Sequence, residues 1–76
     1  MEITTEDMVS LALKHGVRCS GEDLRWMLRG QGLSDMWVHD ALNRLRDGEI
    51  IRLRVTPRPV WIMAHPGTTE FISLAV

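Results

Sequence analysis

The sequence has a single cysteine, no tyrosine, one phenylalanine and no long apolar run. One cysteine, Cys19, cannot form an internal disulfide, and this favours a reducing compartment. No segment approaches the roughly 20 apolar residues of a membrane-spanning helix, and the acidic start of the chain is unlike a basic secretory signal. We therefore expect a cytoplasmic protein that does not associate with a membrane.

The chain also lacks a marked excess of charge of either sign. Its formal net charge is −1, whereas a nucleic-acid binder usually carries a basic excess. The 76 residues are 45% hydrophobic and 25% charged, which is typical of one small folded domain. Lys14 is the only lysine, and arginines are concentrated from Arg44 to Arg58. Because guanidinium groups suit both phosphates and protein interfaces, this distribution leaves both kinds of partner open.

Residue patterns for catalysis or metal binding are missing as well. His15 and Cys19 are four residues apart but are interrupted by a glycine, while His39 and His65 have no Cys or His neighbour at ligand spacing. No Ser, Cys or His occurs in a recognisable nucleophile setting, and a chain of this length has little room for a substrate cleft. We expect no enzyme, no cofactor and no metal site.

What the sequence does contain is a clear series of helix caps and helical spacings. Helices are predicted over residues 5–15 after the cap Thr4, over 21–29 after Ser20, and over 34–47 from Ser34. Gly30-Gln31-Gly32 predicts a sharp turn between the last two helices, with Leu33 filling the angle. The expected core stripes are Met8, Val9, Ala12 and Leu13; Leu24, Met27 and Leu28; and Val38, Ala41, Leu42 and Leu45.

Two strands are predicted after the helices, over residues 50–55 and 60–64, around the turn Thr56-Pro57-Arg58-Pro59. A symmetric four-residue turn would place Val55 opposite Val60, Leu53 opposite Ile62 and Arg54 opposite Trp61. Residues 17–19 are expected to add a short third strand to this ribbon. The tail 68–76 is apolar without a helical period, and we expect it to cover the core or to pack on a second copy. The homodimer contacts would then be Phe71, Ile72, Leu74 and Val76.

Residues 33–64, LSDMWVHDALNRLRDGEIIRLRVTPRPVWIMA, resemble the winged helix-turn-helix superfamily of small prokaryotic and viral regulators. The similarity lies in a cap, a valine four residues on, an Ala-Leu pair, a further Leu, a Gly, an Ile and an Arg-rich hairpin. Residues 4–33 are compatible with the first two helices of that family. The resemblance implies one α+β domain, mainly α, over residues 1–76: a three-helix winged helix-turn-helix with a two- or three-stranded β-wing around an all-helical core.

By that resemblance, residues 34–47 would form the recognition helix and residues 56–59 the wing of a small DNA-binding transcriptional regulator. Contacts in the major groove would come from His39, Asn43 and Arg44, and phosphate contacts from Arg46, Arg52, Arg54 and Arg58. Asp35 and Asp40 depart from the pattern, and Asp40 could pair with Arg44 one turn further on.

The main alternative is a winged-helix module that binds another protein and not DNA, which the near-neutral charge and the carboxylates of the third helix favour. For the arginines, the alternative is a solvated face neutralised by Asp47, Glu49 and nearby acids. Trp37, at the edge of the apolar stripe of the third predicted helix, is expected in the core rather than as a residue that stacks on bases. Trp26 points away from Leu24, so it either packs beneath the first helix or the tail, or anchors a partner.

Overall fold

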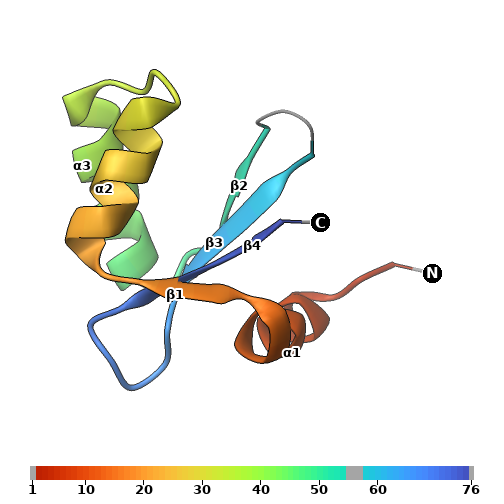
Figure 1. Ribbon diagram of the computed structural model, residues 1–76. Helices are drawn as coiled ribbons and strands as arrows, with labels where there is room; N and C mark the ends of the chain where they lie inside the picture. The colour runs from red at the N-terminus through yellow and green to blue at the C-terminus, as the bar shows by residue number, and fades with distance from the viewer. Residues whose placement is uncertain (1, 55–57, 76) are drawn as a thin grey trace.

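The computed structural model describes residues 2–54 and 58–75 of the chain. These residues form the elements α1, β1, α2, α3, β2, β3 and β4, in that order (Figure 1). The four strands form one antiparallel sheet in the order β1-β4-β3-β2. The predicted α+β class is confirmed, but the sheet has four strands where we expected a wing of two or three.

The helices begin at the polar residues that the sequence indicates. In α1 (Thr5–His15), Thr4 and Asp7 form a reciprocal capping box with two hydrogen bonds of 3.1 Å. The hydroxyl of Ser20 accepts from the Asp23 N–H at 3.1 Å before α2 (Gly21–Gly30). The hydroxyl of Ser34 accepts from the Trp37 N–H at 3.2 Å before α3 (Asp35–Arg46). Each cap satisfies a backbone donor that the helix itself leaves unpaired.

The turn between α2 and α3 is a Schellman motif. Gly32 has φ +87°, a left-handed conformation that glycine adopts without steric cost. Its N–H donates to the Arg29 carbonyl at 2.9 Å, and the Leu33 N–H donates to the Leu28 carbonyl at 3.4 Å. Leu33 packs against the hydrophobic cluster that contains Leu28, so its predicted place between the helices is confirmed.

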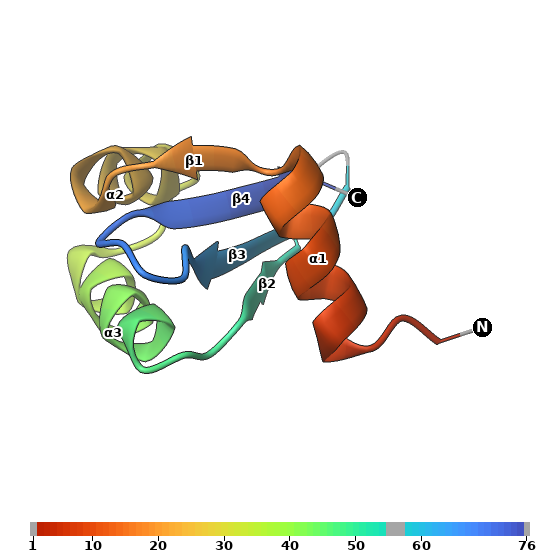
Figure 2. The same ribbon diagram turned by 90° about the horizontal axis from the view of Figure 1, so that it is seen from below.

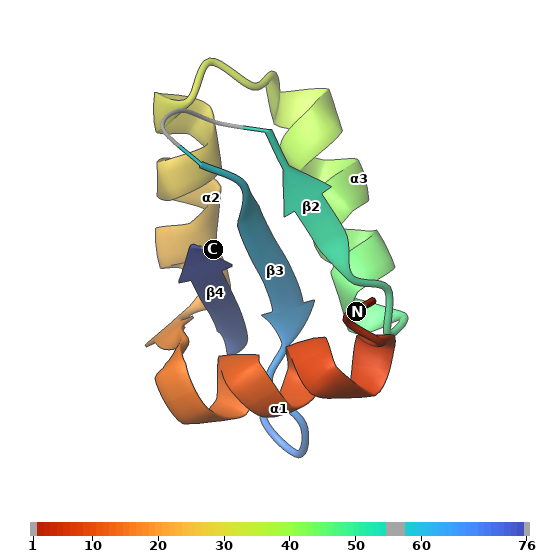
Figure 3. The same cartoon turned by 90° about the vertical axis from the view of Figure 1, so that its right-hand side faces the viewer.

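The sheet separates the helices into two layers. The pair α2–α3 lies on one face and α1 crosses the other, as Figures 2 and 3 show from two directions. Under α2–α3 lies a cluster of Leu24, Leu28, Val38, Leu42, Leu45, Leu53, Ile62 and Phe71. Under α1 lies a smaller cluster of Met8, Ala12, Met63 and Ile72. Because strand residues contribute to both clusters, the expectation of an all-helical core is wrong.

The apolar tail is the strand β4 (Phe71–Ala75), and it lies inside the sheet between β1 (Val17–Cys19) and β3 (Val60–Ala64). Phe71 and Ile72 are each 1% exposed, one in each cluster. Of the two alternatives for the tail, covering the core is therefore confirmed, and a homodimer contact through Phe71 and Ile72 is wrong. Leu74 is half-buried against the cluster under α1, and Val76 lies outside the described residues.

The short strand β1 forms as expected but with another partner. It pairs with β4 and not with the ribbon, placing Arg18 opposite Ile72 and Cys19 opposite Phe71. The side chains of Arg18 and Glu70 form an ion pair beside this contact. The tail thus lies between β1 and β3, whereas the prediction paired β1 directly with the ribbon.

The ribbon register also differs from the prediction. In β2 (Ile51–Leu53), Leu53 lies opposite Val60 and Arg52 lies opposite Trp61, so Arg54 does not face the indole. Pro59 has no N–H to donate to a ladder, which is consistent with pairing that starts at Val60. The expected turn at residues 56–59 falls partly, and the pairing of Val55 wholly, outside the described residues.

Three apolar side chains assigned to the core lie at the surface. Leu13 is 50% exposed, and Met27 and Trp37 are each 38% exposed. Each lies at the border of an apolar stripe, where helical spacing alone does not fix how far a neighbouring layer extends. The centres of the stripes are buried as predicted.

Candidate functional site

The residues predicted to contact DNA lie on different parts of the molecule. His39 and Asn43 are exposed on α3, on the side turned away from the sheet, because Val38 and Leu42 are buried against the sheet. The predicted arginines fall into three groups.

Arg44, in the last turn of α3, forms an ion pair with Glu49. Gly48, with φ +93°, closes a second Schellman motif in which the Glu49 N–H donates to the Arg44 carbonyl at 3.1 Å. The side chains repeat this contact, with Nε to Oε2 at 3.0 Å and Nη2 to Oε1 at 3.1 Å. This two-point hydrogen bond lowers the pKa of the Glu49 carboxyl and raises the pKa of Arg44. A DNA contact by Arg44 would have to break this ion pair. The ion-pair partner of Arg44 is Glu49 and not Asp40.

Arg46 and Arg52 lie on opposite faces of the sheet. The Arg46 guanidinium is 5.9 Å from the centre of the Phe71 ring, which belongs to the cluster under α2–α3. The Arg52 guanidinium is 5.5 Å from the centre of the Trp61 ring, which packs on the cluster under α1. Both are cation–π contacts. The structure therefore does not bring Arg46 and Arg52 together on one face of the sheet.

Arg54 and Arg58 are exposed on either side of residues 55–57. The end of β2 and the start of β3 lie at the same end of the molecule as the turn between α2 and α3 (Figure 3). Among residues 2–54 and 58–75, neither of these arginines takes part in an ion pair or a cation–π contact.

Sequence reasoning did not combine the residues on the outer side of α2–α3. Two depressions of about 420 and 450 Å³ there share Arg25 and Trp26 in their walls. One continues to Arg29 and Asp35, which form an ion pair, and the other continues to Arg46. Trp26 is 71% exposed, so it does not pack beneath α1 or the tail. Its direction follows from helical spacing, because Leu24 and Leu28 are buried on the opposite side.

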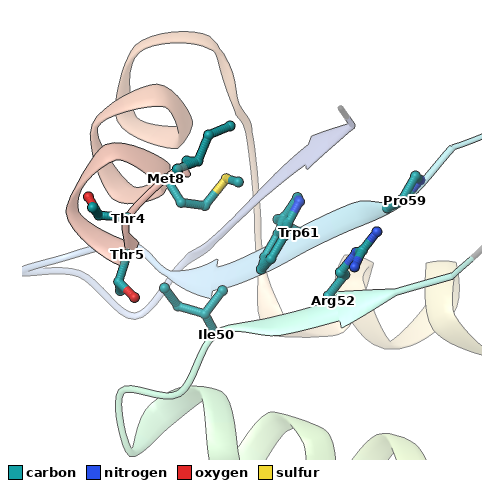
Figure 4. Close-up of a pocket in the computed structure, with 8 residues that line it drawn as sticks. Thr4, Thr5, Met8, Ile50, Arg52, Pro59 and Trp61 are labelled. Atoms are coloured by element: carbon teal, nitrogen blue, oxygen red, sulfur yellow. The ribbon is translucent and has the colours of Figure 1, made fainter. Parts of the chain in front are cut away.

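A further depression of about 500 Å³ lies on the other face of the sheet, where α1 leaves part of the strands uncovered (Figure 4). The start of α1 forms one wall, and β2 and β3 form the other. Among the described residues, Arg52 is the only charged side chain that lines it. Its full lining is Ile3, Thr4, Thr5, Met8, Ile50, Arg52, Pro59 and Trp61.

Reactive groups are scarce in the described part of the chain. Burial, with Asp23 and Glu70 nearby, raises the pKa of the Cys19 thiol, which keeps it in the less nucleophilic protonated form. Residues 2–54 and 58–75 hold no cluster of three His, Cys, Asp or Glu side chains placed to bind a metal ion. The same residues contain no helix with the length and apolarity needed to cross a membrane.

Comparison of the chain with protein-family models, with curated proteins and with solved structures finds no match. Function therefore has to be argued from the surfaces described above.

Proposed function

We propose that this chain is a protein-binding module that uses the outer side of α2–α3, centred on Trp26. The exposed indole, at 71%, is the observation that carries the proposal. Leaving so large an apolar ring in water forgoes the stabilisation of burial, and tryptophan is enriched among the residues that dominate protein interfaces. A partner side chain can enter the depression on either side of the ring.

Two arginines beside Trp26 favour a partner segment that carries a single carboxylate, and Glu22 lines the same depression. Arg25 and Arg46 line the depression next to the indole, and neither belongs to an ion pair within residues 2–54 and 58–75. A carboxylate placed beside an apolar side chain could bond to either guanidinium while the apolar group contacts the ring. The partner that fits is a peptide segment with a large apolar residue flanked by Asp or Glu.

The balance of charge on the helix pair argues against a polyphosphate backbone at the same place. Between residues 21 and 49 the carboxylates outnumber the arginines: Glu22, Asp23, Asp35, Asp40, Asp47 and Glu49 against Arg25, Arg29, Arg44 and Arg46. Two of those arginines are already paired with Asp35 and Glu49. Binding to nucleic acid depends on neutralising several phosphates, which this surface is poorly equipped to do.

Trp26→Ala is expected to weaken binding of acidic, apolar peptides by roughly thirtyfold or more, because loss of an interface tryptophan costs about 2 kcal/mol or more. Short peptides would be selected from a random library on the intact chain, and their affinities measured by fluorescence anisotropy. We expect the selected peptides to share an apolar residue next to Asp or Glu.

Trp37→Ala is the matched control, since it removes an indole that lines neither depression on the outer side of α2–α3. Circular dichroism would establish that both variants remain folded. Peptides that bind Trp26→Ala and the intact chain equally well, or a selection without acidic peptides, would refute the proposal.

Sequence-specific binding of double-stranded DNA by a small winged-helix regulator is the second candidate. It is favoured by Arg54 and Arg58, which are exposed at one end of the molecule, together with Asn43 and His39 on α3. This function requires measurable affinity for duplex DNA at low salt, falling with a log-log slope of about 0.9 per phosphate engaged. It also requires that Arg54→Ala with Arg58→Ala weakens binding.

Titration of the chain with duplex DNA at low and at physiological salt separates the two candidates. The protein-binding proposal expects no detectable DNA affinity at either salt concentration. Salt-dependent affinity that is lost in the double arginine variant would instead support the regulator, with the wing as its phosphate contact.

A further inference from the structure

The depression between α1 and the sheet has the composition of a small-molecule site. Its volume of about 500 Å³ lies within the range of ligand pockets, which are mostly apolar with a few converging polar groups. Met8 and Ile50 supply apolar walls from opposite sides, and the broad ring of Trp61 lies between them and Arg52 (Figure 4). None of this surface overlaps the outer side of α2–α3.

The polar groups of this depression favour an anion. Arg52 is the only charged residue of the lining, and the described residues contain no ion pair that would neutralise it. Its guanidinium lies 5.5 Å from the centre of the Trp61 ring, and this cation–π contact favours its position beside the ring. The Thr5 hydroxyl takes part in none of the described side-chain hydrogen bonds, whereas Thr4 is used in the capping box.

We propose that this depression binds a small aromatic carboxylic acid. The carboxylate bonds to the Arg52 guanidinium, and the flat apolar body packs along the indole of Trp61 toward Met8 and Ile50. An extended polyanion does not suit the site, because only one guanidinium is present. A fully apolar ligand does not suit it either, because it would take water away from that guanidinium without replacing its hydrogen bonds. A planar body with a single charge matches both the ring and the cation.

The test uses naphthoate as the probe and neutral naphthylmethanol as its uncharged match. Heteronuclear NMR of the intact chain would follow the indole N–H of Trp61 and the methyl group of Met8 during each titration. We expect naphthoate to move both signals and to leave the Trp26 indole unchanged. We expect Arg52→Gln to weaken naphthoate binding roughly tenfold or more, as loss of a charged hydrogen bond does.

Arg54→Gln is the matched control, because it removes an exposed arginine next to β2 that does not line the depression. It should bind naphthoate like the intact chain. The proposal is overturned if millimolar naphthoate leaves the Trp61 signal in place, if naphthylmethanol binds equally well, or if Arg52→Gln retains full affinity. Since Trp26 lies on the other side of the sheet, failure here leaves the peptide-binding result unaffected.

Discussion

Phe71→Ala is expected to lower the free energy of unfolding by about 3–5 kcal/mol, the usual cost of truncating a buried aromatic side chain. Phe71 is 1% exposed in the main hydrophobic cluster, on a strand with neighbours on both sides. Its ring also carries the Arg46 guanidinium at 5.9 Å from its centre. The substitution therefore removes packing under α2–α3 and the cation–π contact together.

The loss is large relative to the stability of so short a chain. Single domains are stable by roughly 0.05–0.15 kcal/mol per residue, or about 4–11 kcal/mol here. Urea titration followed by circular dichroism should show a much lower midpoint for Phe71→Ala, or a chain already unfolded in water. Leu74→Ala, on the same strand but half-buried, should lose much less. Equal losses in the two variants would contradict the central position of Phe71.

The local parts of this fold could be predicted because their causes lie within a few residues. Thr4, Ser20 and Ser34 each accept a hydrogen bond from an N–H three residues on, and such a contact depends on sequence spacing alone. The turn at Gly32 likewise needs only a residue that tolerates positive φ. For the same reason the centres of the helical stripes were identified correctly.

The position of β4 could not be predicted, because its cause is not local. A strand in a sheet that is covered on one face alternates apolar and polar residues. The strand β4 is covered on both faces, because Phe71 packs against α2–α3 and Ile72 packs against α1. Its run of apolar residues is then compatible with a buried strand or with an apolar tail. The choice between a strand and a tail depends on the position of α1 on the other face of the sheet, which no local pattern gives.

The position of α1 on the second face of the sheet also explains where the predicted site residues lie. The exposure of Asn43, Arg54 and Arg58 followed from local spacing and is observed. The structure places Arg46 and Arg52 on opposite faces of the sheet, because their ring partners Phe71 and Trp61 lie in different clusters. The pocket at Arg52 exists only because α1 covers part of that face.

Gly16→Ala is expected to lower the free energy of unfolding by about 1–3 kcal/mol, the usual cost of forcing additional atoms into a packed site. The helix predicted over residues 5–15 ends before Gly16, and α1 does end there. Glycine is required at this position by the lack of space and not by backbone conformation, because the φ of Gly16, −72°, is open to any residue. A Cβ atom at this position would lie 2.2 Å from Cγ2 of Ile72 and 2.5 Å from the Ala12 carbonyl oxygen. The end of α1 would have to move away from β4, which opens the smaller cluster.

Gly30→Ala provides the control for this prediction. A Cβ atom there meets nothing within 4 Å, so alanine should be neutral or stabilise the chain by up to about 1 kcal/mol. The cause of the Gly16 effect can be isolated by repeating Gly16→Ala in an Ile72→Ala background, which lacks the clashing methyl group. Thermal unfolding should then show a smaller loss than in the intact chain, because only the contacts with the carbonyl oxygens of Ala12 and Ser73 remain. If alanine at Gly16 costs as little as alanine at Gly30, α1 is not held against β4 as closely as described.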